Sequence, residues 1–271
     1  TSRVYKILGD QIDKVFPDVQ LREVDYQMIM DFRIIKYASG LSNNSIHHYL
    51  RTLRAVINEG INRGLYDANK YPFKRNLMPR VQPTAKRALE IDQIKALVGY
   101  QPRGRREEVA KDLLLLIFLL RGLDMVDILH LKPENIQSSR IVVSRKKTGM
   151  AVSIFILPQA ELIIRKYRDD NWLFKYLDSN IDSDRVRYET KVTGLLKSMK
   201  AIGHNLEFSS NLNSKVMRHS FATLGKHIGC TRDVMMELLG HQSKTVTDIY
   251  QTGYSNEILD DWHKKIAGMV F

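Results

Sequence analysis

The sequence predicts a mainly α-helical protein with one small antiparallel β-sheet. Three observations lead to this fold class: apolar residues recur at helical spacing through most of the 271 residues, one central segment alternates with a period of two, and a basic stretch with several prolines separates two helical regions. Apolar residues make up 44% of the chain, which is enough to fill a core on each side of that stretch. We therefore expect a helical domain at residues 1–80, a linker at 81–88 and a mixed domain with a tail helix at 89–271.

The first domain is predicted to contain helices at residues 7–16, 26–37 and 45–61, each with apolar residues on one face. The third helix follows a Ser-Asn-Asn-Ser run, whose side-chain oxygens can cap its first turn. The polar face of this helix and the linker gather cationic and imidazole side chains. Such a row is by itself most often a solvated surface, and its members are His47, His48, Arg51, Arg54, Arg80 and Lys86.

The second domain is predicted to begin with helices at residues 91–98, 107–120 and 124–131. Alternating apolar residues then indicate a β-hairpin within 140–157, whose turn reads Lys146-Lys147-Thr148-Gly149. Helical patterns resume at residue 159 and include 185–199, 216–227, 232–239 and 246–254. The apolar tail at 256–271 can pack on a neighbouring subunit or fold back on its own domain, and the sequence does not choose between these.

The formal net charge is +12, from 42 Lys and Arg against 30 Asp and Glu. This excess favours a polyanionic partner, with nucleic acid as the first expectation and an anionic membrane surface as the second. The longest apolar run, at 113–120, has eight residues, whereas a membrane span needs roughly 20. The single Cys230 cannot form an internal disulfide, which suits a reducing cytoplasm. Because the chain begins at Thr1 without methionine, we expect it to be a fragment or a processed form.

The segment from Lys215 to Tyr250 carries the clearest functional signal. It contains Arg218 followed by His-Ser-Phe-Ala-Thr, then a Leu-Gly-His turn that ends at His241, and Tyr250 nine residues later. This arrangement resembles the C-terminal signature of the tyrosine recombinases, the phage integrase family. The resemblance extends over almost the whole chain. It implies a SAM-like helical core-binding domain, a basic linker beside DNA, and a mixed α+β catalytic domain.

The resemblance also implies phosphoryl transfer without a metal ion or cofactor. A side-chain hydroxyl attacks the phosphorus while cations neutralise the non-bridging oxygens. Tyr250 matches the nucleophile, with Tyr254 one turn later as the fallback, and Arg218 matches the residue that clamps the phosphate. Lys215 stands where the family usually has histidine. His241 is then the better residue to contact the phosphate or assist the tyrosine.

The predicted hairpin carries the general acid that the resemblance implies. A lysine on this turn protonates the leaving 5′ oxygen in the family, and Lys147 best matches its position. Lys146 and Arg145 are close enough in sequence to be alternatives. His219 and Asp127 are expected to support the site by packing or by orienting its other residues, and the six residues of the first-domain face and the linker are expected to contact DNA.

One residue departs from the family pattern. Asp124 stands where most tyrosine recombinases have a catalytic arginine, and a carboxylate that faces the scissile phosphate would repel it. Asp124 should therefore point elsewhere or be paired. If the preceding helix continued through Arg121, that guanidinium could reach the same pocket from one turn away. An arginine at this offset resembles integrases of Bacteroides-type conjugative transposons, so we expect Arg121 to be the substitute.

These observations together predict a site-specific DNA recombinase, the integrase of a mobile element. It would cleave and rejoin double-stranded DNA through a 3′-phosphotyrosyl intermediate, as a homotetramer on paired sites in a bacterial, nucleoid-associated cytoplasmic setting. An arm-binding domain can precede Thr1, as in larger integrases. Two alternatives stay open: a type IB topoisomerase-like enzyme, and a catalytically inactive DNA-binding relative, which Asp124 keeps under consideration.

Overall fold

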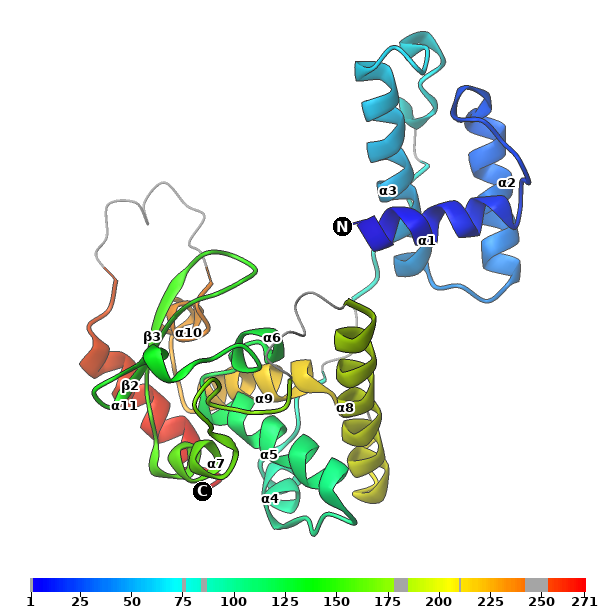
Figure 1. Cartoon of the computed structure of the whole chain (residues 1–271). Helices are drawn as coiled ribbons and strands as arrows, with labels where there is room; N and C mark the ends of the chain where they lie inside the picture. The colour runs from blue at the N-terminus through cyan, green and yellow to red at the C-terminus, as the bar shows by residue number, and fades with distance from the viewer. Residues whose placement is uncertain (1, 75–76, 84–86, 178–184, 210, 242–252) are drawn as a thin grey trace. The chain divides into compact units, whose positions relative to one another are not determined.

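The computed structural model describes residues 2–74, 77–83, 87–177, 185–209, 211–241 and 253–271. The chain divides into two compact units, Thr1–Ala85 and Lys86–Phe271 (Figure 1). No helix in the described ranges is long and apolar enough to cross a membrane. Each unit has its own apolar core, and each is described here by itself.

Three helices form unit 1: α1 (Ser2–Asp13), α2 (Tyr26–Ala38) and α3 (Asn43–Asn62). The side chains of Asp25 and Ser42 accept backbone hydrogen bonds at the starts of α2 and α3, which satisfies amide groups that have no partner within the helix. Short 3-10 turns follow at Leu21–Glu23, Ala68–Lys70 and Pro72–Lys74. The core between the helices includes Ile29, Phe32, Ile46, Leu50 and Ile57.

Unit 2 is mostly helical and holds a three-stranded antiparallel sheet, which confirms the predicted fold class. The strand order is β1-β2-β3, and Ile141 of β2 pairs with Ile154 of β3. The sequence did not predict β1, because two residues are too few to show an alternating pattern. In chain order the elements are α4 (Ile91–Gly99), α5 (Arg105–Leu119), α6 (Met125–Ile128), a 3-10 turn (Pro133–Asn135), β1 (Ile136–Gln137), β2 (Arg140–Ser144), β3 (Ala151–Phe155), α7 (Pro158–Tyr167), α8 (Arg185–Asn205), α9 (Ser214–His227), α10 (Arg232–Leu238) and α11 (Asn256–Ala267).

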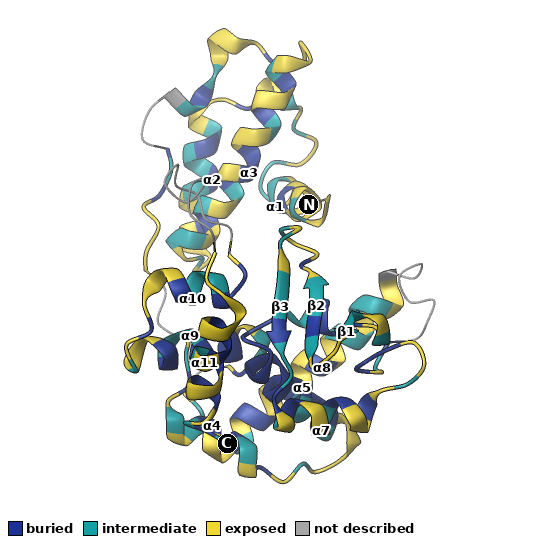
Figure 2. Cartoon of the chain, turned by 90° about the vertical axis from the view of Figure 1, so that its left-hand side faces the viewer, coloured by how far each residue is buried: buried dark blue, intermediate teal, exposed yellow. Residues whose placement is uncertain are grey.

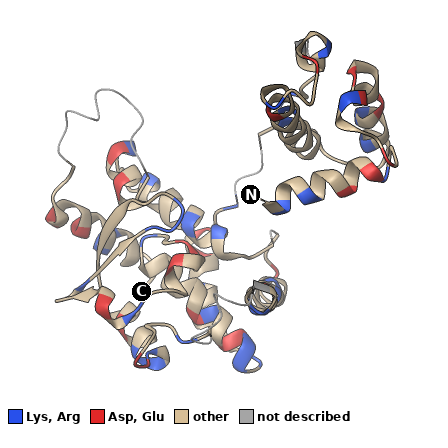
Figure 3. Ribbon diagram, turned by 45° about the horizontal axis from the view of Figure 1, so that its top comes forward, with Lys and Arg blue, Asp and Glu red and all other residues tan. Residues whose placement is uncertain are grey.

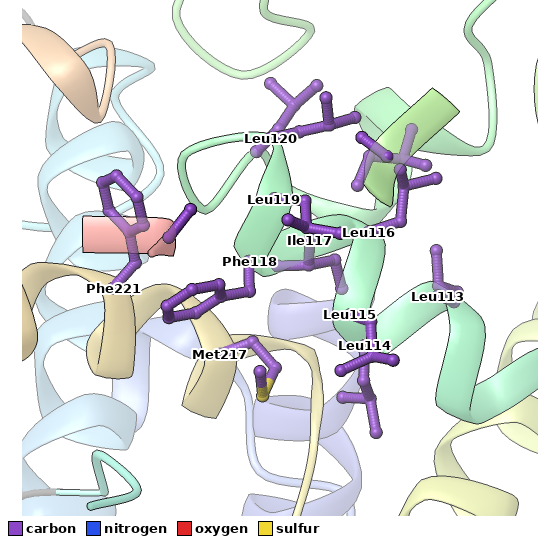
Figure 4. Close-up of a cluster of buried hydrophobic side chains, with 14 of the residues drawn as sticks. Leu113, Leu114, Leu115, Leu116, Ile117, Phe118, Leu119, Leu120, Met217 and Phe221 are labelled. Atoms are coloured by element: carbon purple, nitrogen blue, oxygen red, sulfur yellow. The ribbon is translucent and has the colours of Figure 1, made fainter. Parts of the chain in front are cut away.

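Helix α5 is the centre of unit 2. Its residues from Leu113 to Leu119 are buried on all sides, because α5 packs against α7, α8 and α9. Figure 4 shows these side chains beside Met217 and Phe221 of α9. The rings of Phe118 and Phe221 meet edge to face, with centroids 5.6 Å apart. This packing fixes α9, which carries Arg218, against the C-terminal end of α5.

The chain leaves α5 in a tight turn. The amide of Gly122 donates to the carbonyl of Ile117 and that of Arg121 to Phe118, the hydrogen-bond pattern of a Schellman motif. Arg121 and Gly122 both have positive φ values, of 55° and 71°. The assumption that a helical path continues through Arg121 is therefore wrong. Instead of a helix over 124–131, only Met125–Ile128 is helical.

The C-terminal helix α11 folds back on its own unit, where it packs against α9, α10 and β3. Leu259 and Ile266 are buried, and His263 has no exposed surface. The residues of α11 divide into buried and exposed ones, as the colours in Figure 2 show. Nε2 of His263 lies 2.9 Å from the carbonyl oxygen of Leu119, at the end of α5. Because that carbonyl can only accept, Nε2 carries a proton and donates it. The tail thus closes one side of the central helix.

Stability should fall in mild acid because of His263. Burial, and then the charge of Arg121, lower the pKa of His263 to about 3, so between this value and the ordinary 6.5 the unfolded chain binds one more proton than the folded chain. The contribution of His263 to the free energy of unfolding is therefore fully present above pH 6.5. It declines as pH falls, so that at pH 5 the free energy of unfolding is lower by about 2 kcal/mol because of this group. Urea unfolding at pH 7 and pH 5 should show this loss in the wild type.

The variant His263→Gln should lack this part of the pH dependence, because glutamine can donate to Leu119 but does not titrate. His227→Gln is the matched control, since His227 lies exposed at the end of α9. An equal loss of stability with falling pH in the His263→Gln variant and the wild type would contradict the assignment.

Candidate active site

Arg218 is the central cation of the site. It lies on α9, its side chain is largely buried, and it donates to backbone carbonyls on both sides: from Nη1 to Gly122 at 2.5 Å and from Nη2 to Leu239 at 2.7 Å. Burial, and then repulsion from Arg145, lower the pKa of Arg218 to about 10, which leaves it charged at neutral pH. The structure thus holds a planar, charged donor group between three segments of unit 2.

His241 lies against Arg218. Its Nε2 is 2.8 Å from Nη2 of Arg218, and because a guanidinium only donates, this ring nitrogen accepts. Burial, and then the charges of Arg218 and Arg145, lower the pKa of His241 below its ordinary value. The histidine is therefore neutral at pH 7, and it can accept a proton or a hydrogen bond.

Asp124 is paired with two cations. Its carboxylate accepts from Nη2 of Arg145 at 2.5 Å and from Nζ of Lys215 at 3.0 Å. Although burial opposes its ionisation, the hydrogen bond and charge of Lys215, together with the charges of Arg218 and Arg145, hold the pKa of Asp124 below its ordinary value. The carboxylate is thus ionised, and the cations around it balance its charge.

In the sequence, Arg145 stands next to the charged turn of the hairpin. In the structure, its side chain is buried. Only 3% of its surface is exposed. Its Nη1 donates to the carbonyls of Leu239 and Gly240, at 3.0 and 2.9 Å. The signal was present in the strand: Ile141, Val143 and Arg145 are alternate residues, so they share the inward face of β2 and its end.

The supporting residues lie around this cluster. Asp127 is buried, accepts from the amide of Lys146 at 2.9 Å, and has its other oxygen 3.7 Å from Nε of Arg145. Lys147 is exposed on the β2–β3 turn, and its charge contributes to the lowered pKa of His241. His219 is exposed on α9, where burial of its ring and then the charge of Lys215 lower its pKa. Tyr250 lies outside the described residues.

Arg121 lies apart from these residues in its contacts. Its guanidinium forms an ion pair with Asp260 of α11 and a weak hydrogen bond, at 3.4 Å, with the carbonyl of Ser153 in β3. Arg140 of β2 binds the same carboxylate. The turn after α5 directs Arg121 to the tail helix, whereas Asp124 faces Arg145 and Lys215. A catalytic role for Arg121 stays a prediction, and these contacts do not favour it.

Two glycines allow the segments of the site to approach closely. A Cβ atom on Gly122 would lie 2.8 Å from Cγ and 3.0 Å from Cα of Arg218, and one on Gly240 would lie 2.6 Å from Val152 and 3.1 Å from Cδ of Arg145. Both glycines also have positive φ. Any larger residue at either position would therefore displace an arginine of the site.

The basic face expected on unit 1 is only partly exposed. His48, Arg51 and Arg54 lie on the surface of α3, whereas His47 is half-buried and has Nδ1 2.9 Å from the carbonyl of Pro79. Arg80 is exposed, and Lys86 lies outside the described residues. Figure 3 shows Lys and Arg interspersed with Asp and Glu along the ribbon of each unit.

Comparison with known proteins places this site in a family. Residues 1–77 match the model of the phage integrase SAM-like domain, and residues 87–257 match that of the phage integrase family. The chain belongs to the phage integrase family. The second match covers more than half of the chain, and it contains Asp124, Arg218 and His241.

Curated relatives of this family member include archaeal proteins named tyrosine recombinase XerA. The protein from Saccharolobus solfataricus is 27% identical over 184 residues, which cover 68% of this chain and 57% of the relative. The protein from Pyrococcus furiosus is 28% identical over 224 residues, which cover 79% and 71%. Both relatives are named as recombinases, and this chain spans little more than half the length of the first.

Solved structures show the same fold. A lambda integrase dimer bound to a COC′ core site has a TM-score of 0.62 and 18% identity, with 93% of this chain and 88% of that chain covered. The XerH recombinase bound to a difH substrate has a TM-score of 0.60 and 19% identity, with 96% and 77% covered. At these identities the likeness concerns the fold, and it spans both units of the chain.

Proposed function

We propose that this chain is the integrase of a mobile element, which cleaves and rejoins double-stranded DNA through a covalent 3′-phosphotyrosyl intermediate. The observation that carries the proposal is the contact between Arg218, buried and charged, and His241, neutral and 2.8 Å away. A buried guanidinium beside an unprotonated imidazole suits a reaction in which negative charge grows on a phosphate while a hydroxyl loses its proton.

In the proposed reaction, Oη of Tyr250 attacks the scissile phosphorus and the bond from phosphorus to the 5′ oxygen breaks. The phenol proton passes to Nε2 of His241, which gives up its hydrogen bond from Arg218 in this step and is unprotonated beforehand because its pKa is lowered. The 5′ oxygen gains a proton from Lys147, which is exposed on its turn. Arg218 and Lys215 stabilise the non-bridging oxygens. One phosphodiester is exchanged for another, so the reaction consumes no nucleotide cofactor.

The proposed substrate is DNA, and the proposed assembly is a homotetramer on two paired sites. A net charge of +12 favours such a polyanion. Related structures include lambda integrase as a tetramer bound to a Holliday junction and the Tn1549 transposon integrase with circular intermediate DNA. The second of these also supports the assignment to a mobile element.

A covalent-trapping assay tests the proposed function. The probe is a pool of nicked duplexes from both ends of the element that encodes the chain, in which the cleaved strand releases a short piece and cannot rejoin. Wild-type protein should form a denaturant-resistant protein–DNA adduct. Tyr250→Phe should form none, because phenylalanine has no nucleophilic oxygen.

Tyr254→Phe tests the fallback nucleophile, since Tyr254 is an exposed tyrosine close in sequence. It should form the adduct at the wild-type rate. An adduct with Tyr250→Phe, or no adduct with the wild type on any duplex of the pool that it binds, would contradict the proposed function.

A further inference from the structure

We propose that Arg145 supplies the second guanidinium of the phosphate pocket, and that Asp124 is the positioning residue that holds it there. This inference rests on the proposed recombinase reaction and adds to it the residue that follows β2. The family pattern has arginine at position 124, where this chain has a carboxylate. That carboxylate forms an ion pair with Arg145, and Arg145 then supplies the positive charge that position 124 lacks.

The side chains of Arg145 and Arg218 lie close together. Arg145 and Arg218 donate to the same oxygen, the carbonyl of Leu239, at 3.0 and 2.7 Å. The two donating nitrogens are therefore no more than the sum of these distances, about 5.7 Å, apart. Both of these nitrogens already donate to protein acceptors, so a phosphate would accept from the other nitrogens of the same two guanidinium groups.

The charged side chains around Asp124 carry a net positive charge. Three cations, Arg145, Lys215 and Arg218, surround two carboxylates, those of Asp124 and Asp127. Without Arg145, the two carboxylates would cancel the charges of Lys215 and Arg218, the two cations assigned to the non-bridging oxygens. With Arg145, a net positive charge remains while His241 is neutral.

Backbone and side-chain contacts hold Arg145 in place. Its amide donates to Met150 at 2.9 Å and its carbonyl accepts from Gly149 at 2.8 Å, so its backbone closes the β2–β3 turn. Gly240 lets the end of α10 lie against its side chain. A guanidinium fixed in this way needs little reorganisation when it meets a developing negative charge.

Arg145 keeps one N–H group that can donate a further hydrogen bond. Nη1 of Arg145 uses both of its N–H groups on the carbonyls of Leu239 and Gly240. Among the described residues, Nη2 has one hydrogen-bond partner, Asp124, so its second N–H can meet a phosphate oxygen. Arg121, by contrast, directs its guanidinium to Asp260, which Arg140 also binds.

The test compares two substrates. One is the nicked duplex with an ordinary scissile phosphate, and the other carries a methyl group in place of one non-bridging oxygen, which removes the negative charge that an arginine would neutralise. Arg145→Ala should slow adduct formation about a hundredfold or more on the ordinary duplex, but less than about tenfold on the methylated one, relative to wild type on each substrate. A residue with only a structural role would lose activity equally on both.

Arg145→Lys guards against a variant that does not fold, because it keeps the charge and loses the planar fork. It should slow cleavage of the ordinary phosphate about tenfold or more, with DNA affinity and thermal unfolding close to wild type. Arg121→Ala is the rival arm, and it should not recover preferentially on the methylated duplex.

Two outcomes would overturn the inference. One is an equal loss, or no loss, on both substrates in the Arg145 variants. The other is recovery on the methylated duplex in Arg121→Ala instead of Arg145→Ala. Failure of the proposed function is separate from both, because it would appear as the absence of an adduct with wild-type protein on the ordinary duplex.

Discussion

Replacing Arg218 by alanine is expected to lower the rate of adduct formation by roughly a thousandfold, because the phosphate pocket loses its central guanidinium. Arg218 links the turn at Gly122 to the end of α10 and contacts His241. Its loss therefore removes a charge and also the partner that orients the histidine. Single-turnover trapping on the nicked duplex, with protein in excess over DNA, measures the rate directly.

Arg218→Lys separates charge from geometry in this experiment. Lysine keeps the positive charge but cannot reach two acceptors with one planar group, so cleavage should still fall about a hundredfold. Arg232→Ala is the control, because Arg232 is an exposed arginine at the start of α10. Cleavage by Arg218→Lys at the wild-type rate would show that Arg218 serves the fold rather than the reaction.

Replacing Asp260 by alanine is expected to destabilise the protein by about 3–5 kcal/mol, because it leaves a buried guanidinium without its counter-ion. Asp260 binds Arg121 and Arg140, and the side chain of Arg121 is 3% exposed. Burial lowers the pKa of Arg121 to about 10 and the charge of Asp260 opposes this fall, so loss of Asp260 would lower that pKa further. Equilibrium unfolding in urea at pH 7 measures the change.

Asp261→Ala is the matched control, since Asp261 is the next residue and lies exposed on α11. Its free energy of unfolding should stay within about 0.5 kcal/mol of wild type. The double variant Arg121→Met/Asp260→Ala should regain part of the stability lost in Asp260→Ala, because it removes the unpaired charge along with its partner. Equal stability of Asp260→Ala and Asp261→Ala would contradict the assigned role of the ion pair.

The sequence could predict most helices of both units, because a helix that packs on one face repeats its apolar residues at a helical period. It could not predict the turn at Arg121 and Gly122. A Schellman motif usually places glycine where this chain has Arg121, so the pattern of side chains at that point still resembled a continuing helix. One change of backbone direction was enough to send Arg121 to the tail instead of the pocket.

The docking of the tail depends on information that its own sequence does not contain. An apolar helical face is the same whether it packs on its own domain or on another subunit. What decides the structure seen here is the complement on the rest of unit 2: the carbonyl of Leu119 for His263, and two arginines for Asp260. These partners are more than 100 residues away in the chain, and only the tertiary structure brings them together.

Some residues of the candidate site could likewise be predicted from the sequence, and others could not. Arg218 and His241 could be named from local spacing, because each lies in a short motif. The pairing of Asp124 with Arg145 could not, since it joins residues 21 positions apart, with α6, β1 and β2 between them. Two weak signals existed in the sequence: the unexpected acidic residue, and an arginine on the alternating inward face of β2. Neither identifies the other as its partner.

The pair of Asp124 and Arg145 bears on how active and inactive members of such a family are sorted. A sequence pattern that requires arginine at position 124 would group this chain with degenerate relatives. A three-dimensional criterion that counts guanidinium groups around the carbonyl of Leu239 would find two among the described residues, from α9 and from the turn after β2. On the proposal for Arg145, the charge of a reaction centre can come from a position that the family pattern does not mark, and relatives without arginine at position 124 should be examined for an acidic residue there that holds another arginine.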